Sequence, residues 1–138
     1  MAYGNNAQEY RKNAVLGASP AGLVVMLYDG ALRFIEGGRL AMHARDLTRQ
    51  NESLVRAQRI VAELNGTLDR EQGGEIATNL SALYGFVQDR LVRANIEDDE
   101  RLLDEAVRTL AGLREAWVEI AGASAVPRPA NREMLLAA

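Results

Sequence analysis

Residues 19–45, SPAGLVVMLYDGALRFIEGGRLAMHAR, decide the fold because they begin and sustain one long helix. Ser19 can cap free N–H groups, and Pro20 suits the first helical position, where its missing N–H would have had no intrahelical partner. Apolar side chains then recur every three, four or seven residues, as one face of a helix requires. This predicted core stripe is Leu23, Met26, Leu27, Gly30, Phe34 and Ala41.

Three further stretches show the same apolar periodicity. They are 46–72, 76–95 and 98–122. Their predicted core faces include Leu47 in the first, Ile76 and Leu83 in the second, and Trp117 in the third. Because the intervening turns are short, consecutive helices should be antiparallel neighbours. The sequence therefore predicts an all-α, antiparallel up-down four-helix bundle.

The predicted bundle occupies residues 19–122 of a single domain, 1–138. A leader, residues 1–18, precedes it and is expected to be a short helical or extended segment. A tail, residues 123–138, contains prolines at 127 and 129 and is expected to be loosely ordered.

Composition excludes several classes of function. The 138 residues include no cysteine, so thiolate catalysis, disulfides and cysteine-based metal sites are ruled out. The net charge of -3 argues against general affinity for nucleic acid, although the second half is more acidic than the first. No apolar run approaches the roughly 20 residues that span a membrane, and no secretory signal pattern is present. We expect a cytoplasmic protein.

Catalytic and metal-binding patterns are also missing. A di-iron bundle needs a Glu-x-x-His pair from each of two helices, whereas His43 is the only histidine. His43 is expected at the surface or at a helix end. We therefore predict no enzyme activity and no cofactor. The pair Gly37-Gly38 is unusual inside a helix, and it indicates either a close helix crossing or bend, or a groove for a partner helix.

Short motifs run through most of the chain in a fixed order. They are Ala18-Ser19-Pro20, Met26-Leu27-Tyr28-Asp29-Gly30-Ala31, Asn51-Glu52, Arg56-Ala57, Leu68-Asp69, Gly73-Gly74-Glu75-Ile76-Ala77, Asn79-Leu80, Leu83-Tyr84, Arg90-Leu91, Ala94-Asn95 and Ala116-Trp117. This string resembles the flagellin export chaperone family, the small bacterial FliS proteins. The resemblance covers about residues 3–120.

The resemblance implies a bundle without a cofactor that binds the disordered C-terminal region of flagellin in the cytosol. It would prevent premature polymerisation of flagellin and keep it competent for type III export. Other implied partners are the export gate and flagellar regulators, with no nucleic acid and no membrane insertion. The protein would be a monomer or a weak homodimer. The alternative is a helical adaptor that docks on a folded export or regulatory protein.

The candidate flagellin-binding positions are large residues of the leader and of the bundle, some of them beside the predicted core stripes and some on them. They are Tyr3, Tyr10, Val15, Leu16, Val24, Tyr28, Leu32, Ile35, Val61, Leu64, Leu83, Tyr84 and Val87. Each bundle position could equally belong to a wide core stripe. The leader could cover a guest groove in the free protein, or it could simply cap the bundle.

Overall fold

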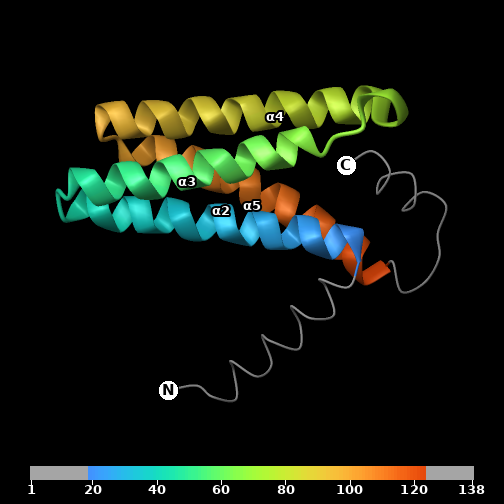
Figure 1. The fold of residues 1–138 in the computed structure, drawn as a ribbon, viewed down its shortest axis with the longest axis horizontal. Helices are drawn as coiled ribbons and strands as arrows, with labels where there is room; N and C mark the ends of the chain where they lie inside the picture. The colour runs from blue at the N-terminus through green and yellow to red at the C-terminus, as the bar shows by residue number, and fades with distance from the viewer. Residues whose placement is uncertain (1–18, 124–138) are drawn as a thin grey trace, which may run out of the picture.

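The computed structural model describes residues 19–123, which form four helices (Figure 1). They are α2 Pro20–His43, α3 Leu47–Gly66, α4 Arg70–Glu97 and α5 Glu100–Ala123. The prediction of an all-α four-helix bundle is confirmed, and no strand occurs between residues 19 and 123. The leader and the tail after residue 123 lie outside the described residues, so their expected conformations remain predictions.

The helices form a ring in which each helix packs against two others. Helix α2 packs against α3 and α5, and α4 packs against the same two helices. Consequently α2 and α4 face each other across the diagonal of the bundle. Short turns join successive helices at alternate ends (Figure 1).

Side-chain caps begin all four helices, and for α5 the Asp99 carboxylate accepts a hydrogen bond from the Arg101 N–H at 2.9 Å. The Ser19 hydroxyl accepts a hydrogen bond from the Gly22 N–H at 3.0 Å, as the Ser-Pro signal predicts. The Asp46 carboxylate accepts from the Arg49 N–H and starts α3, while the Asp69 carboxylate accepts from two N–H groups and starts α4.

The boundary between α3 and α4 differs from the prediction. We expected one helix up to residue 72 and a new one from Ile76, but α3 ends at Gly66 and Asp69 caps an extra turn at the start of α4. The predicted break at the glycine pair exists inside α4, where Gly74 has φ +49° and ψ -122°. Glycine tolerates that conformation because it has no Cβ.

Three consecutive residues of α2 each contact a different helix. The Tyr28 hydroxyl lies 2.6 Å from the Tyr84 hydroxyl of α4, across the diagonal. Asp29 forms an ion pair with Arg114 of α5. Gly30 faces α3, and a Cβ there would lie 3.2 Å from Ile60 Cδ1. This segment therefore fixes α2 against all its partners at one level of the bundle.

The tyrosine pair satisfies two polar groups inside the core. Tyr28 is 0% exposed and Tyr84 is 2% exposed. Burial raises the pKa of both phenols, and the neighbouring Tyr84 raises that of Tyr28 further, so both stay neutral at ordinary pH. A buried hydroxyl without a partner costs free energy, whereas here one phenol hydroxyl donates a hydrogen bond to the other.

The close approach of α2 and α3 explains one of the two adjacent glycines. A Cβ on Gly38 would lie 2.5 Å from Leu54 Cδ2, which no real side chain could accommodate without movement. The close-crossing interpretation of the glycine pair is therefore confirmed at Gly38.

The predicted core stripe of α2 is wrong for its first two members. Leu23 is 57% exposed and Met26 is 46% exposed, and Leu47 of α3 and Ile76 of α4 are also exposed. The buried face of α2 consists mainly of smaller residues around Tyr28. They are Ala21, Gly22, Val25, Tyr28, Gly30, Ala31, Ile35, Gly38 and Ala41. Because α2 approaches its neighbours closely, small residues occupy the contact and several large ones are left at its edge.

Polar networks join the helices at the end of the bundle where α2 meets α3 and α4 meets α5. The buried Gln50 amide donates to Asn95 and to the Asp98 carboxylate, at 3.1 and 2.8 Å. Arg39 pairs with Glu100 and Asp104, each at 2.8 Å. These contacts connect the residues around the α2–α3 turn to those around the α4–α5 turn.

The tyrosine pair makes a testable prediction about stability. Replacing Tyr28→Phe leaves the Tyr84 hydroxyl buried without this partner, so the free energy of unfolding should fall by about 1–3 kcal/mol. The double variant Tyr28→Phe/Tyr84→Phe should lose less than the sum of the single losses, because no phenol of the pair is then stranded. Urea denaturation of all four proteins measures this coupling, and strictly additive losses would contradict it.

The adjacent glycines should respond to alanine in opposite directions. Gly38→Ala should destabilise the protein by about 1–3 kcal/mol, since the new Cβ would overlap Leu54. Gly37→Ala should be neutral or stabilising by up to ~1 kcal/mol, because its Cβ meets only the rotatable Ser53 hydroxyl, at 3.2 Å. Thermal denaturation compares the two variants, and equal losses would show that α2 and α3 are not in this close contact.

Candidate partner-binding surface

Eight large apolar side chains are exposed in the described part of the chain. They are Leu23, Met26, Leu40, Leu47, Ile76, Leu83, Val92 and Ile96. A bundle of this kind buries its apolar residues where it can, so several exposed ones at helical spacing indicate a surface that meets a partner.

Four of these residues lie in the half of the bundle where α2 and α4 begin. Leu23 and Met26 are three residues apart on α2, and Ile76 and Leu83 are seven residues apart on α4. Each spacing puts both side chains of a pair on one helix face. Because α2 and α4 are diagonal, the two pairs occupy different sides of the bundle.

The other four lie in the opposite half. Leu40 and Leu47 flank the α2–α3 turn, and Val92 and Ile96 are four residues apart near the end of α4. At 100° per residue, Val92 is about half a turn around α4 from Leu83. The exposed apolar residues therefore surround the bundle and do not form one patch.

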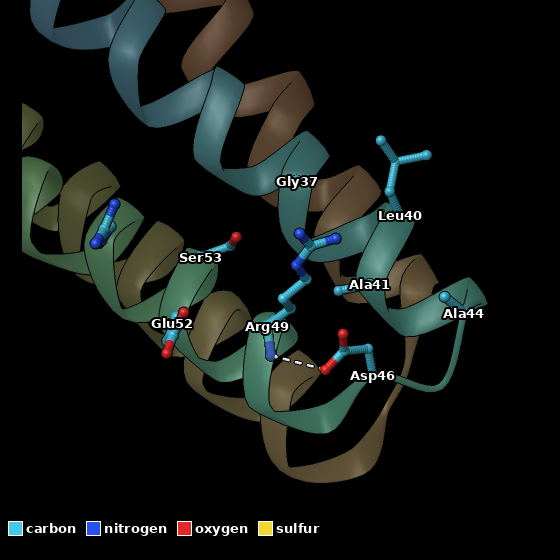
Figure 2. Close-up of a pocket in the computed structure, with 9 residues that line it drawn as sticks. Gly37, Leu40, Ala41, Ala44, Asp46, Arg49, Glu52 and Ser53 are labelled. Carbon is cyan, nitrogen blue, oxygen red and sulfur yellow. Dashed lines mark hydrogen bonds between the residues drawn. The ribbon is translucent and has the colours of Figure 1, made fainter.

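A groove of about 520 Å³ runs between the end of α2 and the start of α3 (Figure 2). Gly37, Ala41 and Ala44 line it from α2, and Arg49 and Ser53 line it from α3. Figure 2 shows the Arg49 side chain extending from α3 toward α2, while Leu40 lies at the edge. Gly37 therefore lines an open groove and has room that Gly38 lacks, while the approach of a partner helix there stays a prediction.

Two charged residues that line this groove, Glu52 and Arg56, do not pair with each other. Glu52 lies four residues before Arg56, a favourable spacing for an ion pair, but neither forms one within residues 19–123. Arg56 instead lies over the Phe34 ring, 5.7 Å from its centroid. The Asp46 carboxylate is engaged in capping α3.

The candidate residues predicted from the sequence fall into three groups. Tyr3, Tyr10, Val15 and Leu16 lie outside the described residues. Six are in the core, at no more than 2% exposure: Tyr28, Ile35, Val61, Leu64, Tyr84 and Val87. Val24 and Leu32 are partly buried against the core, and Leu83 is exposed. Of the described candidates, only these last three reach the surface, and a role in binding for any of the thirteen stays a prediction.

Sequence reasoning placed Leu23, Met26, Leu47 and Ile76 in the core and gave no role to Leu40 or Ile96. A signal for α2 was available, because alanines and glycines recur beside Tyr28 with the same helical period as the larger residues. Weighting large side chains over small ones placed Leu23 and Met26 in the core, although the other four members of that stripe are buried or packed against the core.

His43 is at a helix end, as expected, and it contacts Glu100 at 2.7 Å. The His43 contact and then the Arg39 contact lower the pKa of the Glu100 carboxyl. No group of three or more potential metal ligands occurs between residues 19 and 123. Among the described helices, none has the length and apolar character needed to cross a membrane.

Comparison with known proteins finds relatives that match most of the chain. A family model described as "Flagellar protein FliS" matches residues 3–124. The flagellar secretion chaperone FliS of Bacillus subtilis is 39% identical over 117 residues, 85% of this chain and 86% of the relative. Its counterpart in Salmonella typhimurium is 40% identical over 115 residues, 83% and 85% of the two chains. The Campylobacter jejuni protein of the same name is 38% identical over 111 residues, 80% and 87% of the two chains. Since both kinds of match extend over most of the chain, it belongs to the FliS family of flagellar secretion chaperones.

Proposed function

We propose that this protein binds the C-terminal region of flagellin in the cytoplasm, prevents its premature polymerisation and keeps it competent for type III export. The family membership supports a chaperone for a flagellar protein. The observation that carries the finer proposal is the set of exposed apolar side chains on α2 and α4, which the bundle itself does not cover.

The distribution of these side chains suits an extended guest better than a single docked helix. A helix in one groove would need anchors along one face, whereas the apolar pairs lie on α2 and α4 and in both halves of the bundle. A segment that is disordered when free can wrap such a surface and fold as it binds. Proposed contacts of such a guest are Leu23, Met26, Ile76, Leu83, Val92 and Ile96.

Residues in the core have an indirect part in this proposal. Tyr28 and Tyr84 are fully packed, so they support the surface and do not touch a guest unless the bundle opens. The partly buried Val24 and Leu32 sit at the margin between the core and the surface. Binding and oligomeric state are therefore best tested with exposed positions, whose replacement leaves the core intact.

Calorimetric titration with the C-terminal segment of the host's flagellin tests the proposal. We expect saturable one-to-one binding, a negative heat-capacity change and a gain of helix beyond the sum of the separate proteins. The chaperone should also protect the flagellin segment from proteolysis. An absence of both binding and protection, with both proteins intact, would favour the adaptor that docks on a folded partner.

Paired aspartate substitutions locate the surface. Leu23→Asp/Met26→Asp and Val92→Asp/Ile96→Asp should each weaken flagellin binding by roughly one to two orders of magnitude, because each removes two apolar anchors. The matched control Thr78→Asp/Ala82→Asp adds the same charges at exposed, four-residue spacing on α4 and should bind normally. Circular dichroism verifies folding of all three. If both apolar pairs can be replaced without loss of affinity, the guest binds elsewhere.

A further inference from the structure

One ion pair between α4 and α5 shows which residues of the two helices lie opposite each other. Arg90 Nε of α4 lies 3.0 Å from Glu105 Oε2 of α5. Since the helices are antiparallel, a step of seven residues back along α4 and seven forward along α5 keeps the two positions level. Leu83 is therefore level with Gly112, and Ile76 is level with Glu119.

This part of the seam is an uncovered apolar face, which we call the α4–α5 face and define by Ile76, Leu83, Gly112 and Ala116. All four residues are exposed, with Ile76 at 48% and Leu83 at 39%. A Cβ built on Gly112 would have no neighbour within 4 Å, so there is room above α5 for another chain. Leu80 and Leu113 lie partly buried below and join the face to the core.

Acidic side chains flank the end of the α4–α5 face that is nearer Ala123, whereas Arg108 lies one turn before Gly112 at its other end. Glu75 precedes Ile76, and Glu115 and Glu119 flank Ala116 on α5. All three are exposed, and none forms an ion pair with another residue in the range 19–123. Elsewhere on α4 and α5, by contrast, Arg90, Arg93 and Arg114 are each paired with a carboxylate. The face therefore suits an apolar segment that carries basic residues.

The sequence that follows α5 has this chemistry. Residues 124–138 read SAVPRPANREMLLAA, with Arg128 and Arg132 ahead of the apolar run Met134-Leu135-Leu136. Pro127 and Pro129 prevent a regular continuation of α5. The family match ends at residue 124, so this segment is a feature of this chain beyond the part that the family model describes.

The chain is long enough to return to the face. Gly112 lies eleven residues before Ala123, about 16 Å back along α5 at the helical rise. The eleven residues from Ala123 to Met134 can span up to about 36 Å when extended. Arg128 and Arg132 would then pass Glu119 and Glu115 before the apolar run reaches Leu83.

We propose that residues 124–138 fold back and cover the α4–α5 face, with Met134-Leu135-Leu136 over Leu83 and Gly112 and the two arginines beside Glu115 and Glu119. Because the segment is tethered only about 16 Å along α5 from Gly112, its effective concentration at the face is of millimolar order, and weak contacts suffice. The inference concerns contacts within one chain and stands or falls independently of flagellin binding.

The absence of cysteine from the whole sequence allows disulfide trapping without background. We would prepare the full chain with Gly112→Cys/Leu135→Cys and follow intramolecular disulfide formation under mild oxidation at low protein concentration. Two controls each share one cysteine with this pair. Leu40→Cys/Leu135→Cys keeps the cysteine at residue 135 but moves the other to α2, in the opposite half of the bundle. Gly112→Cys/Val15→Cys keeps the cysteine at residue 112 and tests whether the leader, instead of the segment 124–138, occupies the face. The first pair should close at least tenfold faster than either control.

Charge and accessibility supply two further readouts. Adding Arg128→Glu/Arg132→Glu to the trapping pair should slow closure several-fold. In a separate single-cysteine chain, Leu83→Cys should react with a thiol reagent several-fold faster once Leu135→Asp/Leu136→Asp is introduced, while Leu40→Cys should be unaffected. Equal closure rates for all pairs, or fastest closure with the leader, would overturn the proposal. So would an unchanged reactivity of Leu83→Cys.

Discussion

The bundle depends on three adjacent residues of α2 that join it to every other helix. Tyr28 reaches across the diagonal to Tyr84 of α4, Asp29 pairs with Arg114 of α5, and Gly30 lets α3 approach. A helix rotates by 100° per residue, so three consecutive positions cover a wide arc and can serve three neighbours at one level. The Met-Leu-Tyr-Asp-Gly-Ala motif, which carries much of the resemblance to FliS proteins, is thus largely a device for assembling the bundle. Only Met26 of this motif is left clearly exposed.

Much of the fold could be predicted from local signals. Ser19-Pro20 begins a helix where expected, the next helix follows Asp46 as the apolar pattern predicted, and the glycine pair at 73–74 contains the one interior residue of α4 with non-helical dihedral angles. The rotation of α2 about its axis could not be predicted in the same way. Two stripes of the same helical period compete on this helix, and the choice between them depends on how closely α3 approaches, which is a tertiary constraint. Because of this rotation, the binding candidates Tyr28 and Ile35 lie in the core, and their role in binding stays a prediction.

The two proposed surfaces follow from one geometric fact. The core of a single ring of four helices is limited in size, and α2 and α4 carry more large apolar residues than it can bury. The exposed pairs on opposite sides of the bundle suit a guest that wraps it, and the acidic rim of the α4–α5 face suits a basic segment of the same chain. If both proposals hold, a guest and the segment 124–138 would meet at Leu83, and the chaperone would release its own cover as the guest binds.

The two ends of the bundle differ in how they are held. At one end, the buried Gln50 amide donates hydrogen bonds to Asn95 and Asp98, and Arg39 ties α2 to two carboxylates of α5. At the other end, Gly74 interrupts the geometry of α4 one turn after its start, so residues 70–73 are not part of an unbroken helical ladder. Local opening therefore requires less free energy there, and amide hydrogens of this turn should exchange without global unfolding. The contacts of Gln50 and Arg39 therefore keep the four helices in register at one end of the bundle. At the other end, the first turn of α4 can open while the rest of the bundle stays folded.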